Sequence, residues 1–244
     1  MELANACELY RDTGFFGQPA NSVTSLAFVV CGVAIAADRK RDLRRRVPYG
    51  LLVIAVGAGS VVQHGPNPDW QAYAHDLPLA TLLAFVAADA AADLLGREVS
   101  PGWWLGVPIA MLPVVAAGPA ASSVTQGGIA AAAIGLNLLR ARRRPRLRRV
   151  LIGSTLILGA GALVGTIGDR TSLCQPGALL QGHAFWHLMA ALALWWLAPA
   201  IGRRESPAMS TVPAGVHLVR PDRSPAARPA HREIPPPHHR RPKE

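Results

Sequence analysis

Two histidines, His183 and His187, stand four residues apart at the start of the last long apolar segment of the chain. Residues at this spacing lie on one face of an α-helix, so both imidazoles can point toward a single atom. Such a pair is typical of a metal site. The residues around the pair carry no charge as far as residue 197, which predicts that it lies in a membrane-spanning helix.

A second pair with helical spacing, Ser60 and His64, stands at the end of another apolar segment. His64 completes a set of three histidines, and catalytic zinc sites typically combine three protein ligands with a fourth position for water. Asp76 lies in the next apolar segment and can act as an outer partner of the ligands or accept a proton from that water. These five residues predict a zinc site that makes water reactive.

Polar residues in apolar helices also have simpler roles. Ser60 and each histidine, taken alone, are more often hydrogen-bond partners of a neighbouring helix than parts of a site. We expect His75 to face the water outside and leave it out of the ligand set. Asp89 and Asp93, again four residues apart, are expected to be solvated at the other end of their segment.

Seven apolar stretches must position these residues. A membrane-spanning helix needs about 20 apolar residues, with a range of about 17 to 25. The stretches that qualify are 20–37, 47–64, 72–95, 103–118, 120–139, 150–168 and 179–201. We therefore predict an all-α polytopic membrane protein, with a bundle of seven transmembrane helices within residues 1–202.

The composition agrees with a membrane protein, because 50% of the residues are hydrophobic and 16% are charged. The net charge of +10 comes from arginines in short connections and in the C-terminal segment, a pattern that indicates membrane topology and not a nucleic-acid partner. The first, third and fifth connections carry nearly all basic residues of the connections, so we expect them in the cytoplasm. The N-terminus is then outside, the C-terminus is inside, and the five candidate residues share one depth near the outer surface.

Residues 203–244 are rich in proline, arginine and histidine, and they lack the apolar residues that a folded core needs. We expect this segment to be a disordered cytoplasmic tail with solvated histidines. The bias of the whole chain toward alanine, arginine and proline favours a bacterial inner membrane as its location.

Three blocks of sequence resemble the alkaline ceramidases, which belong to a larger superfamily of seven-span membrane hydrolases that includes the adiponectin receptors. The blocks occur in the family's order, and block order and topology agree along the membrane part of the chain, roughly residues 7–201. In the second block, this chain lacks the intervening residue of the family's Asp-x-Leu-Pro signature. The blocks are Cys7-Glu8 followed by residues 18–25, Gly59-Ser60 with His64 and Asp76-Leu77-Pro78, and residues 182–187.

The resemblance implies roles for the five candidate residues. His64, His183 and His187 would bind zinc. Asp76 would orient or deprotonate the water, and Ser60 would donate a hydrogen bond to the substrate carbonyl as the oxyanion forms. The expected activity is that of an intramembrane zinc-dependent amide hydrolase, which cleaves a ceramide-like N-acyl lipid from the bilayer into a fatty acid and a sphingoid-type amine.

The same resemblance implies a disulfide between Cys7 and Cys174, since the family ties its N-terminal segment to the loop before the last span. Eukaryotic members also bind calcium with an acidic cluster near the first span. This chain has Glu8 but carries Gln18 where one acidic ligand would align, so calcium is not expected. The alternative to an enzyme is a non-catalytic seven-span receptor or regulator in which the metal is structural.

Overall fold

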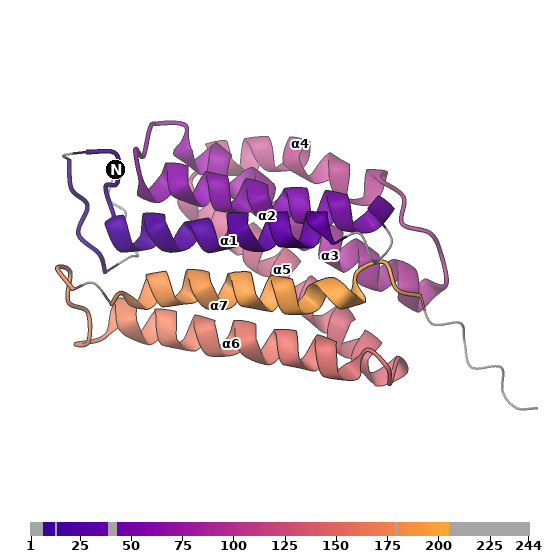
Figure 1. Ribbon diagram of the computed structural model, residues 1–244. Helices are drawn as coiled ribbons and strands as arrows, with labels where there is room; N and C mark the ends of the chain where they lie inside the picture. Colours follow the sequence, from indigo (N-terminus) through magenta and orange to yellow (C-terminus); the bar gives the residue numbers. More distant parts are fainter. Residues whose placement is uncertain (1–6, 13, 39–42, 179, 205–244) are drawn as a thin grey trace, which may run out of the picture. The chain divides into compact units, whose positions relative to one another are not determined.

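The computed structural model describes residues 7–12, 14–38, 43–178 and 180–204, and Figure 1 shows its helices. The described residues form seven α-helices and a short 3₁₀ helix, with no strand among them, which confirms the predicted all-α class. Most of the expected tail, from residue 205 onward, lies outside the described residues. The helices are α1 (Pro19–Ala37), α2 (Leu43–His64), α3 (Gln71–Leu95), α4 (Gly102–Ala116), α5 (Pro119–Arg143), α6 (Arg148–Arg170), α7 (Gly182–Leu197) and the 3₁₀ helix η1 (Ala198–Ala200).

Each apolar stretch of the sequence corresponds to one helix, but the helices differ in their fitness to cross a membrane. Among the described residues, α1, α2, α3 and α6 are long and apolar enough to span one, and these four helices indicate a membrane protein. The helices α4 and α7 have 15 and 16 residues. At 1.5 Å per residue they are about 22 to 24 Å long, less than the roughly 30 Å of bilayer hydrocarbon. The seven-span arrangement and its orientation stay predictions.

The helices pack in a closed circuit. Helix α1 contacts α2 and α7, α7 contacts α6, and the circuit continues through α5 and α3 back to α2. Helix α4 lies against α3 and α5. In Figure 1, α1 and α7 run side by side, with α6 next to α7. Large apolar side chains of α6 face outward, with Leu156 67% and Leu163 62% exposed, as suits a surface in contact with lipid.

The turn between α4 and α5 depends on one glycine. Helix α4 ends at Ala116 and α5 begins at Pro119, so the chain reverses within two residues. Gly118 makes this possible with a φ of 111°, a conformation that side chains with a Cβ rarely adopt. Pro119 then occupies the first helical position, where the missing N–H has no acceptor to lose. This confirms the break expected between residues 118 and 120.

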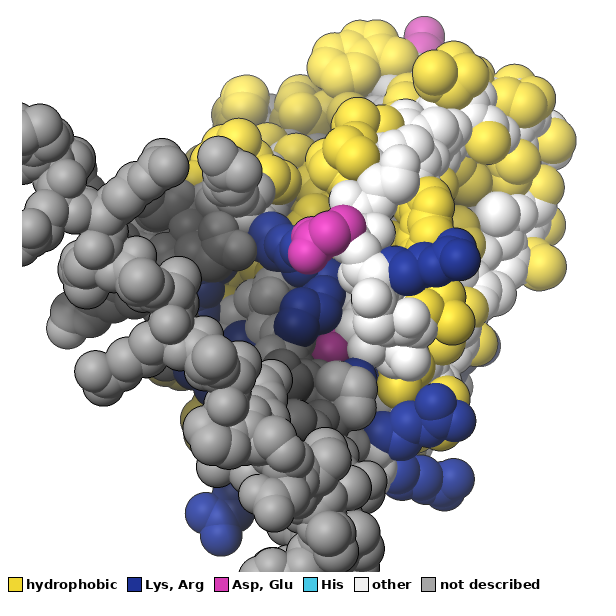
Figure 2. Space-filling model, turned by 90° about the vertical axis from the view of Figure 1, so that its right-hand side faces the viewer, with side chains coloured by type: hydrophobic (Ala, Val, Ile, Leu, Met, Phe, Trp, Pro, Cys, Tyr) yellow, Lys and Arg dark blue, Asp and Glu magenta, His cyan; other side chains and the backbone are white. Residues whose placement is uncertain are grey.

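A buried charge cluster closes the end of the bundle opposite the histidines, which we call the arginine end. Asp89 and Asp93 on α3 are each 1% exposed, so the expectation that water solvates them is wrong. Arg140 of α5, itself fully buried, donates from Nε to Asp93 Oδ2 over 2.7 Å and from Nη1 to Asp89 Oδ2 over 3.1 Å. Because α5 packs on α3, the guanidinium of Arg140 takes the place of water as the hydrogen-bond donor to these two carboxylates. Figure 2 looks at this end, where Arg side chains gather beside acidic ones.

The same guanidinium holds the end of the last helix. Arg140 Nη2 donates to the carbonyl oxygens of Ala200, over 3.0 Å, and Arg203, over 2.7 Å. Arg204 in turn donates from Nη1 to Asp89 Oδ1 over 3.1 Å. Helices α3 and α5 and the segment after α7 are therefore joined through one set of buried charges.

We predict that Arg140→Met lowers the free energy of unfolding in detergent by about 3 to 5 kcal/mol, because two buried carboxylates lose their main cation. Arg143→Met, the same change at an exposed position of the same helix, should have little effect. Thermal unfolding of the two purified variants measures the difference. Equal melting temperatures would show that the cluster does not stabilise the fold.

Candidate metal centre

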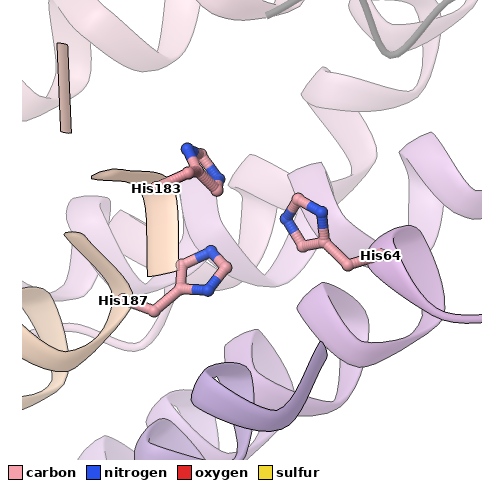
Figure 3. A group of neighbouring side chains, drawn as sticks. All are labelled: His64, His183 and His187. Atoms are coloured by element: carbon pink, nitrogen blue, oxygen red, sulfur yellow. The ribbon is translucent and has the colours of Figure 1, made fainter. Parts of the chain in front are cut away.

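His64, His183 and His187 converge at the other end of the bundle, the histidine end. His64 is the last residue of α2, while His183 and His187 occupy the first two turns of α7. Figure 3 shows the three rings turned toward a common space. One ring nitrogen from each lies within 4.8 Å of the other two. The ring centroids are 5.1 Å apart for His64 and each of the others, and 4.6 Å apart for His183 and His187. This group can hold a metal ion.

A side-chain amide holds the ring of His64. Its Nδ1 lies 2.6 Å from Gln18 Oε1. The other end of that amide is fixed, because Gln18 Nε2 donates to the carbonyl oxygen of Glu8 over 2.7 Å. Oε1 is therefore the atom that faces the imidazole, and an amide oxygen only accepts, so His64 carries its proton on Nδ1. The Nε2 lone pair remains for a ligand.

Oxygen atoms hold the other two rings in the same way. Nδ1 of His187 donates to the carbonyl oxygen of Asn21 over 3.1 Å, with the hydroxyl oxygens of Thr24 and Ser25 at 3.2 and 3.3 Å. Nδ1 of His183 lies 3.4 Å from Asp169 Oδ2. His64 and His187 therefore have hydrogen-bond acceptors at Nδ1, and a carboxylate lies near Nδ1 of His183, which leaves Nε2 of each ring for the shared space. Metal-binding histidines are typically oriented by such outer partners.

The segment before α1, which contains Cys7 and Glu8, contacts these outer partners. Cys7 and Cys174 form a disulfide with a Cα–Cα distance of 5.6 Å, as the resemblance to the alkaline ceramidases implied. The N–H of Cys7 donates to Asp169 Oδ1 over 3.4 Å, so the segment contacts the carboxylate that faces His183. The carboxylate of Glu8 accepts N–H bonds from the first turn of α1, over 2.8 and 2.9 Å. The covalent link thus fixes the start of α1 close to the start of α7.

The outer partners were not identified as such from the sequence. Gln18, Asn21 and Ser25 carried a usable signal, because polar residues at positions i, i+3 and i+7 mark one face at the start of an apolar helix. Asp169 carried no such sequence signal, since an acidic residue beside Arg170 at the end of a span is expected to lie at the membrane interface. Its role depends on α6 and α7 being neighbours, which the sequence does not encode locally.

Ser60 lies next to the metal centre. It is 1% exposed, and its hydroxyl is 2.8 Å from the hydroxyl of Ser25. Ser25 donates its own proton to the carbonyl oxygen of Asn21 over 2.7 Å, so Ser60 is the donor of the pair. The hydroxyl that was expected to help a reaction is therefore linked, through Ser25, to the residues around His187.

Asp76 was expected to be an outer partner of the ligands or to accept a proton from the water. Its described hydrogen bonds run to Nδ1 of His75, at 2.7 Å from Oδ1, and from the hydroxyl of Ser122, at 2.6 Å from Oδ2. Ser122 belongs to α5, and Nε2 of Gln126, on the same helix, donates to the hydroxyl oxygen of Ser122 over 2.9 Å. Asp76 therefore sits in a polar bridge between α3 and α5 at the histidine end.

No known family model matches this chain, and no curated protein matches its sequence. The donor set itself fits zinc, which binds imidazole nitrogens at about 2.0 to 2.1 Å, so that two such nitrogens lie about 3.3 Å apart in a tetrahedral site. The nitrogens of the three rings lie within 4.8 Å of one another, so they would move closer together around a bound zinc ion. Three neutral imidazoles with oriented outer partners are a common zinc-binding set.

We predict that Asp169→Asn weakens zinc binding about 10- to 100-fold, because the carboxylate that orients His183 loses its charge. Isothermal titration of the metal-depleted protein with zinc measures the affinity. Asp69→Asn, the same change at an exposed position between α2 and α3, is the control and should leave the affinity unchanged. Equal affinities of the two variants would contradict a role of Asp169 at the metal centre.

Proposed function

We propose that this protein is a membrane-embedded, zinc-dependent hydrolase that cleaves the amide bond of a ceramide-like N-acyl lipid. The observation that carries the proposal is the convergence of three histidines, two of them hydrogen-bonded through Nδ1 and the third beside a carboxylate. Such preorganisation leaves three nitrogens for one ion and a further position for a reactant. The apolar outer surface of the bundle suits a substrate that arrives from lipid.

The proposal includes the membrane arrangement. All seven helices would cross the bilayer of a bacterial inner membrane, with the histidine end near the outer leaflet and the arginine end at the cytoplasm. Supporting this, basic residues concentrate at one end of the helices and the polar site at the other. The resemblance to alkaline ceramidases in three ordered blocks favours an amide of a long-chain amine as the substrate.

The chemistry follows from the groups at the histidine end. His64, His183 and His187 would hold the zinc, which when bound supplies Lewis-acid chemistry for a carbonyl and for water. Ser60 would turn its hydroxyl from Ser25 to the amide oxygen as negative charge develops there. Asp76, acting with its neighbour His75, would handle the proton that passes from water to the leaving amine.

The test combines metal analysis with turnover. Purified wild-type protein should contain one zinc ion per chain and release fatty acid from an N-acyl sphingoid lipid in detergent. His187→Ala should lose the zinc and lower turnover by more than about 100-fold, since a ligand is removed. His231→Ala, the same change in the basic C-terminal segment, is the matched control and should retain both.

Two results would contradict the proposal. Zinc-free protein that still hydrolyses the lipid amide would exclude the metal from the reaction. Zinc-containing protein that releases no fatty acid from any amide or ester would instead identify a non-catalytic receptor or regulator with a structural metal.

A further inference from the structure

The carboxylate of Asp76 has both oxygens engaged by protein groups. Oδ1 lies 2.7 Å from Nδ1 of His75, and Oδ2 accepts the hydroxyl proton of Ser122 over 2.6 Å. A carboxylate only accepts, so the proton between His75 and Asp76 belongs to Nδ1. In its neutral form, the imidazole of His75 with this proton on Nδ1 has a basic lone pair at Nε2. This is the relation of an orienting carboxylate to a histidine base.

His75 is held next to the turn of α2 that carries Ser60. A Cβ added to Gly59 would lie 2.0 Å from the carbonyl oxygen of Ala74 and 3.0 Å from the Cα of His75. The two helices are therefore in direct backbone contact at this level, which only a glycine permits. His75 and Ser60 stand on either side of this contact, so α3 brings the imidazole to the depth of the metal centre.

His75 is near two of the three ligands without joining the group. It interacts electrostatically with both His64 and His187. It is nevertheless absent from the group whose nitrogens can bind one ion. Its side chain is 20% exposed, whereas the buried ligand His64 is 3% exposed, so water can reach His75. A base must stand in this kind of position, near the reacting atoms and outside the coordination sphere.

We infer that His75 is the residue that carries the proton in this hydrolysis, and that Asp76 is the residue that positions it. The inference rests on the proposed function, because it divides between two residues the proton transfer that was assigned to Asp76 with its neighbour. It also gives a use to Ser122 and Gln126, which hold the carboxylate from α5. The groups that face His75 are Asp76 on α3, His64 on α2 and His187 on α7.

The proton transfer balances as follows. Nε2 of His75 takes a proton from water as the oxygen forms a bond to the amide carbon. The C–N bond then breaks, its electron pair stays on nitrogen, and Nε2 returns the proton to that nitrogen. One water and one amide yield one fatty acid and one amine, and His75 ends in its starting state.

The test compares His75→Ala with Thr81→Ala, a change on the same helix at a hydroxyl that bonds the carbonyl oxygen of Leu77 over 2.6 Å. His75→Ala should keep one zinc per chain with wild-type affinity and lose at least about 100-fold in lipid-amide turnover. Thr81→Ala should keep both. Retained turnover in His75→Ala would overturn the inference while leaving the zinc hydrolase intact. Loss of zinc would show instead that His75 is a ligand.

A spectroscopic measurement tests the positioning role without turnover. Nitrogen-15 spectra of histidine-labelled protein should show His75, assigned by its loss in His75→Ala, with its proton on Nδ1. Asp76→Asn should move that proton to Nε2, because the replacing amide can donate to Nδ1. An unchanged proton position would overturn the positioning role. Wild-type protein without any turnover would overturn both the proposed function and the role of His75. The assay of the wild-type protein, made before any variant, therefore separates this outcome from failure of the inference alone.

Discussion

The structure depends on one constraint, the immobilisation of three imidazole rings through their Nδ1 atoms. An amide from the start of α1 holds His64, a backbone carbonyl of α1 holds His187, and a carboxylate at the end of α6 faces His183. Each acceptor comes from a helix other than the one that carries the histidine. The geometry of the site is therefore a property of the bundle, and the packing of α1, α2, α6 and α7 maintains it.

The two ends of the bundle use buried polar groups in different ways. At the arginine end, opposite charges neutralise one another, and Arg140 has acceptors for its Nε and both Nη atoms. At the histidine end, hydrogen bonds fix the rings while one nitrogen of each remains available. The arrangement at the arginine end stabilises the fold, whereas the arrangement at the histidine end leaves ring nitrogens free to bind a ligand. This contrast explains why Asp89 and Asp93, though spaced like ligands, serve packing.

Much of the architecture was predictable because hydropathy is read along the chain. Seven apolar stretches gave seven helices, and the four-residue spacing of His183 and His187 placed both on one face. His64 could be added to this pair because the arginine-rich connections predict that the end of its apolar stretch lies on the same side as the start of the last stretch. Where membrane crossing is concerned, α5 differs from its neighbours, because its polar residues and its arginines leave it outside the helices apolar enough to span.

What escaped prediction were contacts between helices that are distant in sequence. The burial of Asp89 and Asp93 needs Arg140, 51 and 47 residues away, and nothing local distinguishes that pairing from solvation. The involvement of Asp169 similarly needs α7 as a neighbour. The bridge from Asp76 to α5 became visible only when α3 and α5 were seen to pack together. Such pairings follow from the fold, so sequence spacing alone does not identify them.

The bond between Cys7 and Cys174 joins residues 167 positions apart. During synthesis, the first cysteine and Gln18 emerge long before the second cysteine and α7. The N-terminal segment therefore has no disulfide partner until six helices have been made, and the histidine group is complete only when α7 has been made. The disulfide then needs an oxidising environment to form and persist. Completion of the site is in this way tied to the synthesis of the last α-helix.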